Sequence, residues 1–251
     1  MFKCNFLNAR YALLLSLVVG VVNPVLAAKG TAWKMVQKEK SLGVQTIHFS
    51  STGVKIADKA RGFTVVSTAP DWNVIAYRDD DKVFCKLTKN QYYGQQAFKV
   101  KHGHSLGKVL KNYTFGPVTA PMYYGPYHND VIKRFDGVPV EVEDLISSFY
   151  KGNSIDGIIL RSVSNAMSRT KTDSSVFMPV DMNPTGVLRE TLSLTSVPYN
   201  ASDFKVPSGM RQVHDMKQVT TGKSKRKEAE SIFLEMGVGD DLGVREQSRT
   251  K

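Results

Sequence analysis

Between residues 43 and 87, apolar and polar positions alternate in short runs that are separated by turn residues. The run Gln45 to Phe49 is followed by a Ser-Ser-Thr-Gly turn and then by a second run, Gly53 to Ala57. Three further runs have the same period of two: Gly62 to Thr68, Trp72 to Tyr77 and Lys82 to Thr88. Strands of this length, joined by Gly, Pro and Asp about ten residues apart, are typical of an antiparallel meander.

The middle of the chain mixes helix and loop signals. The pattern favours helices over Gln91–Val100 and His102–Lys111, and a loop rich in Pro, Gly and Tyr over Pro117–Tyr127. A further helix is expected from Glu143 to Lys151, because its apolar residues fall on one face and Gly152 can stop it.

Strand patterns return in the second half of the chain, over residues 157–164, 175–180 and 187–197. Beyond them, Lys223 to Met236 is expected as a basic amphipathic helix. Together these patterns predict a mainly β protein with helices (α+β). Its expected core is a curved, half-barrel-like antiparallel meander sheet with a helical lid or insert, followed by a C-terminal helix.

The N-terminus has the layout of a secretory signal peptide. Lys3 and Arg10 precede an apolar run, and residues 25–27 have the small-residue pattern of a cleavage site. The run is shorter than the ~20 residues of a membrane-spanning helix, although an uncleaved anchor is the alternative. We therefore expect a signal peptide over residues 1–27, one β-rich domain over 28–219, and a basic helix with a polar tail over 220–251. The expected location is periplasmic or extracellular.

Composition and charge narrow the expected partners. The 251 residues carry a net charge of +11, and residues 28–120 hold 15 Lys or Arg against 6 Asp or Glu. Outside the cytoplasm, such a surface suits anionic lipid head groups or acidic envelope polymers, although a merely soluble face explains it as well. The lysines are not interleaved with an RNA-binding signature, so no nucleic acid partner is expected. Of the two cysteines, Cys4 would leave with the signal peptide, so Cys85 has no partner for an internal disulfide.

The run from Ser196 to Met210 contains the end of a strand, a small polar link and then Phe204-x-x-Pro207-x-Gly209. It resembles the closing segment of exported proteins with the LolA-like half-barrel fold, a group that includes periplasmic carriers of lipoproteins. The resemblance spans roughly residues 30–215 and implies an apolar concave face beneath a helical lid, where a lipid or lipoprotein partner leaves water. The candidate wall residues are Phe63, Val65, Trp72, Val74, Ile75 and Phe84. Ordinary core packing explains the same residues.

Three histidines offer a different chemistry. His102 and His104 are separated by one residue, a spacing that can hold a metal ion, and His128 lies further along the chain. A chance pair is the alternative interpretation. The sequence has no His-Glu-x-x-His motif and no phosphate-binding glycine loop, and no cofactor is expected.

Three function hypotheses follow. The first is an exported, non-enzymatic protein that binds an apolar or amphiphilic, lipid-like ligand on a concave sheet. The second is an exported metal-dependent enzyme that uses His102, His104 and His128. The third is a cell-envelope adaptor that binds acidic polymer through a basic face. A carrier needs an open apolar cavity, the enzyme needs three clustered imidazoles, and the adaptor needs a contiguous patch of Lys and Arg.

Overall fold

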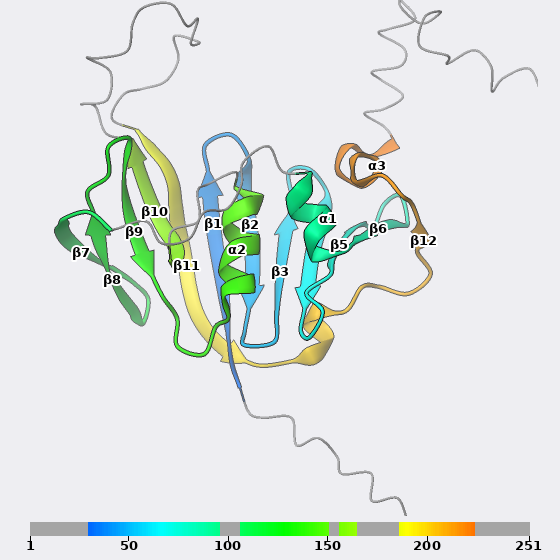
Figure 1. Ribbon diagram of the computed structural model, residues 1–251, viewed down its shortest axis with the longest axis horizontal. Helices are drawn as coiled ribbons and strands as arrows, with labels where there is room; N and C mark the ends of the chain where they lie inside the picture. The colour runs from blue at the N-terminus through cyan, green and yellow to red at the C-terminus, as the bar shows by residue number, and fades with distance from the viewer. Residues whose placement is uncertain (1–29, 96–105, 151–155, 165–185, 224–251) are drawn as a thin grey trace, which may run out of the picture.

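The computed structural model describes residues 30–95, 106–150, 156–164 and 186–223. These residues form an open, curved sheet of 12 strands in the order β12-β6-β5-β4-β3-β2-β1-β11-β10-β9-β8-β7, and α2 lies across one face of it (Figure 1). The first six strands are β1 (Thr31–Glu39), β2 (Gly43–Phe49), β3 (Gly53–Asp58), β4 (Phe63–Thr68), β5 (Val74–Arg78) and β6 (Val83–Leu87). The others are β7 (Val109–Phe115), β8 (Val118–Tyr123), β9 (His128–Lys133), β10 (Ile158–Ser164), β11 (Val187–Pro198) and β12 (Arg211–Gln212). The helices are α1 (Lys89–Gly94), α2 (Val140–Phe149), α3 (Met216–Thr221) and the 3-10 helix η2 (Ala201–Phe204).

Two antiparallel meanders, β1 to β6 and β7 to β11, are joined where β1 pairs with β11. This pairing runs from Thr31 opposite Pro198 to Glu39 opposite Arg189. At the far edge, β12 pairs in parallel with β6. The long β1–β11 ladder makes one continuous sheet out of two halves that are distant in sequence.

The prediction of a mainly β, curved antiparallel sheet is confirmed, and the strands expected between residues 43 and 87 are present. The helix expected over His102–Lys111 is wrong at its end, because β7 begins at Val109. The loop expected over Pro117–Tyr127 is also wrong. It contains β8, in which Val118, Ala120 and Met122 are buried with period two although Pro121 interrupts the ladder.

Several predicted segments lie outside the described residues. They are the signal peptide, the end of the helix expected over Gln91–Val100, the strand at 175–180 and most of the helix at Lys223–Met236. In the part of the chain that the structure describes, no helix is both long and apolar enough to cross a bilayer.

Side-chain alternation gives the sheet two different faces. The main hydrophobic cluster lies on the face that α2 covers and includes Leu145 and Ile146 of this helix. The opposite face carries a smaller cluster around Val66, Tyr77 and Phe204, the last of which comes from η2. The run that resembles a LolA-like closing segment therefore covers the opposite face.

A buried arginine attaches the C-terminal part of the described chain to the sheet. Arg78 on β5 is 5% exposed, and its Nε donates to the carbonyl of Val219 at 2.7 Å. Its Nη2 donates to the carbonyls of Thr220 and Arg61, at 3.0 and 2.5 Å. Asp80 lies 3.3 Å from Nη1 but is largely exposed, so the carbonyls supply the buried contacts. The guanidinium thus satisfies carbonyls at the end of α3.

Replacing this arginine should loosen α3. We expect Arg78→Leu to lower the free energy of unfolding by about 3 kcal/mol, because three carbonyls lose a charged donor. Urea unfolding followed by circular dichroism measures the change. Arg134→Gln is the matched control. It removes an exposed 3.6 Å ion pair with Asp156 and should change the stability by no more than about 0.5 kcal/mol. Equal stability of the two variants would contradict the role of Arg78.

Candidate functional site

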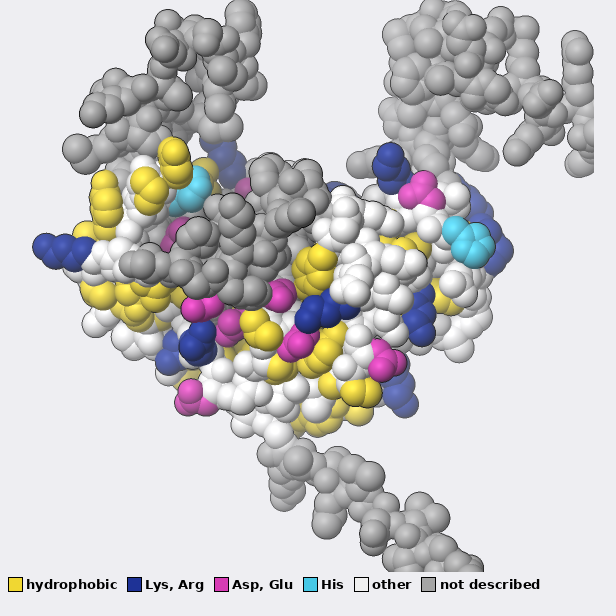
Figure 2. Space-filling view, in the orientation of Figure 1, with side chains coloured by type: hydrophobic (Ala, Val, Ile, Leu, Met, Phe, Trp, Pro, Cys, Tyr) yellow, Lys and Arg dark blue, Asp and Glu magenta, His cyan; other side chains and the backbone are white. Residues whose placement is uncertain are grey.

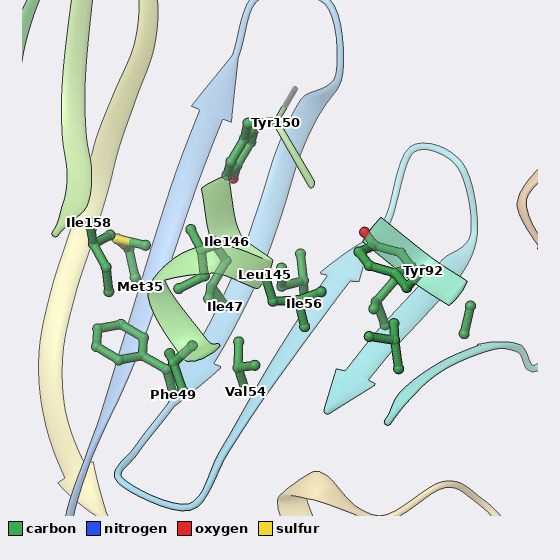
Figure 3. Packing of buried hydrophobic residues seen from close by; sticks show 14 of the residues in the cluster. Met35, Ile47, Phe49, Val54, Ile56, Tyr92, Leu145, Ile146, Tyr150 and Ile158 are labelled. Carbon is green, nitrogen blue, oxygen red and sulfur yellow. The ribbon is translucent and has the colours of Figure 1, made fainter. Parts of the chain in front are cut away.

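The strand register arranges the side chains beneath α2 in rows across the sheet. Residues that are directly opposite each other on neighbouring strands point to the same face, and every second residue along a strand does so. The row nearest the start of α2 is formed by Val54, Phe49 and Trp33. The next row is formed by Val65, Ile56, Ile47, Met35 and Leu194. Both rows are apolar, and Figure 3 shows several of these side chains beneath Leu145 and Ile146.

The two rows nearest the end of α2 are different in character. The third row is formed by Phe63, Asp58, Gln45, Gln37 and Thr191. The fourth row is formed by Glu39, Arg189, Ser162 and Asp130. Apart from Glu39, all of these polar side chains are buried. The face beneath α2 therefore changes along the strands from an apolar end to a polar end, and we call it the graded face.

Side chains of the third row satisfy carbonyls at an irregular point of β10. The register of β10 against β9 shifts between Ile159 and Arg161, which interrupts the regular ladder. Gln37 Nε2 donates to the Ile159 carbonyl at 2.7 Å and to Thr191 Oγ1 at 3.1 Å. Thr191 Oγ1 donates to the Leu160 carbonyl at 2.7 Å. These buried polar residues therefore hold β10 against β1 and β11.

The polar end meets α2 at an arginine–tyrosine stack. The Arg189 guanidinium lies 3.8 Å above the centre of the Tyr150 ring, and the Tyr150 hydroxyl donates to Gln45 Oε1 at 3.4 Å. Burial lowers the pKa of the Arg189 guanidinium and raises the pKa of the Asp130 carboxyl, although Ser162 donates a hydrogen bond to Asp130. Arg189 Nε and Asp130 Oδ1 are buried without a hydrogen-bond partner.

A second arginine, Arg61, contacts Asp58 and Phe63 of the third row at the polar end. Arg61 Nε lies 2.6 Å from Asp58 Oδ2, and the guanidinium lies 4.9 Å from the centre of the Phe63 ring and 5.4 Å from that of Phe149. Because Asp58 is fully buried and already accepts from Arg61, this carboxylate is paired. Arg189 has no equivalent ion pair within the described residues.

A small pocket opens where the chain enters α2, at the apolar end of the graded face. Its volume is about 350 Å³, and it is lined by Arg134, Phe135, Asp136, Gly137, Val138, Val140 and Glu143. The Phe135 ring contacts Trp33 and Phe49 of the first apolar row, at centroid distances of 5.0 and 5.1 Å. Gly137 has a φ of 72°, which favours glycine at this turn.

The predicted wall residues fall on both faces of the sheet. Phe63, Val65 and Val74 are buried in the cluster beneath α2, with Trp72 partly buried against it. Phe84 packs against the cluster on the opposite face, and Ile75 points to that same face because it alternates with Val74. The structure thus brings together four of the six residues.

Sequence reasoning missed the polar rows. Gln37 and Gln45 stand in phase with the apolar residues of their strands, two positions from Met35 and Ile47. A polar residue in phase with a buried face is the signal that could have found them. The role of Arg189 had no such local signal, because it depends on Tyr150, which lies 39 residues earlier in the chain.

The histidines of the metal hypothesis are not brought together by the described part of the chain. His128 is exposed at the start of β9, while His102 and His104 lie outside the described residues. Among the residues that are described, no group of three metal-ligating side chains occurs.

The sequence around Ser105 also matches two nucleophilic-serine patterns. Residues 103–107 read Gly-x-Ser-x-Gly, and Ser105 and Lys108 have the spacing Ser-x-x-Lys. The first pattern requires a strand before the serine and a helix after it in an α/β-hydrolase sheet. Ser105 itself lies outside the described residues, but strand β7 begins at Val109 and the sheet around it is antiparallel. The structural context of that motif is therefore not met.

Basic residues on the opposite face form an interrupted row. Across β1, β2 and β3, Lys34, His48 and Lys55 are neighbours, but Val66 and Ile75 separate them from Lys86. Burial lowers the pKa of His48, and Lys34 lowers it further. On the side drawn in Figure 2, basic and acidic side chains are interspersed with apolar ones. Neither arrangement is the contiguous basic patch that an adaptor for acidic polymer needs.

Comparisons with known proteins give no family. No protein-family model matches the chain, and no curated protein matches it. A solved structure with partial similarity is that of an uncharacterized conserved protein from Thermus thermophilus. It has 8% sequence identity and a TM-score of 0.31, over 75% of this chain and 92% of that one. A likeness of this size carries no conclusion, so the resemblance to LolA-like proteins stays a prediction.

The raised pKa of Asp130 gives a pH-dependent expectation. A carboxyl whose pKa is higher in the folded than in the unfolded state stabilises the fold below the unfolded value, near 3.8, and loses this contribution as the pH rises. Asp130→Asn should therefore be about as stable as the wild type in acid and more stable at neutral pH. Urea unfolding of both proteins across this pH range provides the test. A stability difference that does not change with pH would contradict the expectation.

Proposed function

We propose that this protein is an exported, non-enzymatic binding protein that holds an amphiphilic, lipid-like ligand between α2 and the graded face. The gradient itself is the observation that supports the proposal. An amphiphile has an apolar tail and a polar head, and the face beneath α2 offers apolar rows at one end and polar rows at the other. Gln37 and Gln45 satisfy carbonyls of the fold itself, whereas the buried Nε of Arg189 has no partner, which a core that served only for packing would not need.

Access requires α2 to move, because Leu145 and Ile146 occupy the space above the apolar rows (Figure 3). Burying each of these side chains stabilises the closed form by about 1.5–3 kcal/mol. A ligand tail stabilises the open form by about 0.8 kcal/mol for each buried methylene group. A tail of about ten methylene groups can therefore replace the helix without a large net cost. The turn at Gly137, next to the pocket, is a place where the chain can bend.

The experiment that tests this function is a native mass measurement of the full chain after export and purification. We expect an extra mass in the range of a lipid that is lost on denaturation. N-phenyl-1-naphthylamine, a neutral dye that fluoresces in apolar surroundings, supplies a second readout with the ligand removed. A bare native mass together with no dye fluorescence would overturn the proposal.

Locking α2 to the sheet should abolish binding. Ile146 of α2 and Ile47 of β2 belong to the same cluster between the helix and the sheet, so we expect a short bifunctional methanethiosulfonate to cross-link the double variant Ile47→Cys, Ile146→Cys. The cross-linked protein should lose most of the dye fluorescence, and reduction should restore it. Mass measurement verifies the cross-link, and the reduced form of the same protein is the control. Equal fluorescence in a verified cross-linked form and in the reduced form would show that the dye does not enter beneath α2.

A further inference from the structure

We propose that Arg189 is the headgroup-binding residue, and that the ligand is an amphiphile whose head is an oxyanion, either a carboxylate or a phosphate. This inference rests on the proposed function, because it adds the class of headgroup to the same site. It is carried by three observations: the place of Arg189 at the polar end of the graded face, its burial, and its unpartnered Nε.

The register directs Arg189 toward the ligand side of the sheet. It stands opposite Glu39 on β1 and opposite Ser162 on β10, and it is two residues before Thr191. Thr191 Oγ1 lies 3.7 Å from the sulfur of Met35 beneath α2, so both β11 side chains point to that face. A tail that lies along the apolar rows would therefore place its head at this arginine.

The guanidinium is buried and retains unused hydrogen-bonding capacity. Arg189 is 8% exposed, and its flat face is covered by the Tyr150 ring at 3.8 Å. Stacking leaves the N–H groups directed outward in the plane of the guanidinium, where a carboxylate or phosphate binds best. Nε has no partner, and within the described residues no carboxylate oxygen lies within the 4.0 Å of an ion pair. A buried cation in this state favours an incoming anion.

Asp130 is an acidic residue in the row of Arg189, but it does not form an ion pair with the arginine. It stands one strand beyond Ser162 in the same row, and it is 9% exposed with Oδ1 unpartnered. Ser162 lies between the two groups, and they make no ion pair. Burial raises the pKa of the Asp130 carboxyl, whereas Ser162, His128 and Arg189 lower it. Arg189 is therefore the group in this row that an oxyanion would pair with.

The test compares ligands that share one tail and differ only in the head. Dodecanoate, dodecyl phosphate, dodecanol and dodecyltrimethylammonium displace N-phenyl-1-naphthylamine from the full chain at neutral pH, each below its micelle concentration. We expect the two anions to act at concentrations about tenfold lower than dodecanol, and the cation to be weakest, since only the anions pair with Arg189. Equal displacement by all four would overturn the inference but leave the proposed function standing. Absence of dye binding by the wild type would overturn the proposed function itself.

Ligands without a tail identify the source of the anion. Acetate and inorganic phosphate should displace no dye and should not weaken the effect of dodecanoate at equal concentration. If either competes with dodecanoate as an equal, the site binds a free anion, and the amphiphile inference is wrong. A preference for only one of the two anionic heads supports the inference and identifies the head as carboxylate or phosphate.

Variants assign the preference to Arg189. Arg189→Gln should reduce the roughly tenfold advantage of the anions over dodecanol to about one, measured as a ratio within the same variant. Arg161→Gln is the matched control, because Arg161 also has a buried Nε without a partner, but it pairs with Glu190 at 3.5 Å and alternates with Ser162, so it points to the other face of the sheet. It should retain the full preference. If Arg189→Gln does not fold, the headgroup series on the wild type still decides the outcome. An unchanged preference in folded Arg189→Gln would overturn the assignment.

Discussion

The pairing of β1 with β11 is the constraint on which the rest of the structure depends. It joins the two meanders, and it also fixes which side chains lie beneath α2. The register contains one irregularity, between Val36 and Gln37, which leaves Leu192 outside the ladder and 54% exposed. A slip by one residue would move Gln37, Met35 and their partners to the opposite face. The rows of the graded face therefore exist only in this register.

Burying polar groups in those rows costs free energy unless each group has a hydrogen-bond or ion-pair partner, and only some of these groups have one. The amide nitrogen of Gln37 and the hydroxyl of Thr191 are matched to carbonyls at the irregular part of β10, so the burial and the irregularity support each other. Asp58 is matched by Arg61. Arg189 and Asp130 each keep an unmatched atom although they stand in one row. Apolar residues of similar volume would fill the same space at lower cost, so stability alone does not account for this pair.

The features of this architecture that depend on short stretches of the chain could be predicted from the sequence. Period-two alternation located strands β2 to β6, because alternation is a property of a single strand. It failed at β8, where Pro121 and its neighbours look like a loop, and at Ile75 and Phe84, which lie on the face opposite the expected wall. The polar rows depend on the contact between the first and the last long strand, and a pairing between residues 150 or more positions apart leaves no local pattern.

The segments that cover the two faces of the sheet link the stability of the protein to its proposed function. An exposed apolar face of this extent would invite association, so the protein needs a segment over it when no ligand is bound. On the opposite face, Phe204 and Tyr199 supply this cover close to the strand that precedes them. On the graded face, α2 supplies this cover through a few apolar side chains, among them Leu145 and Ile146. Under the proposed function, the ligand tail takes the place of α2 over the apolar rows. Its affinity therefore reflects the difference in free energy between burial of these rows by the ligand and their burial by α2. The headgroup then decides whether the ligand binds, because it offers Arg189 the anionic partner that α2 does not provide.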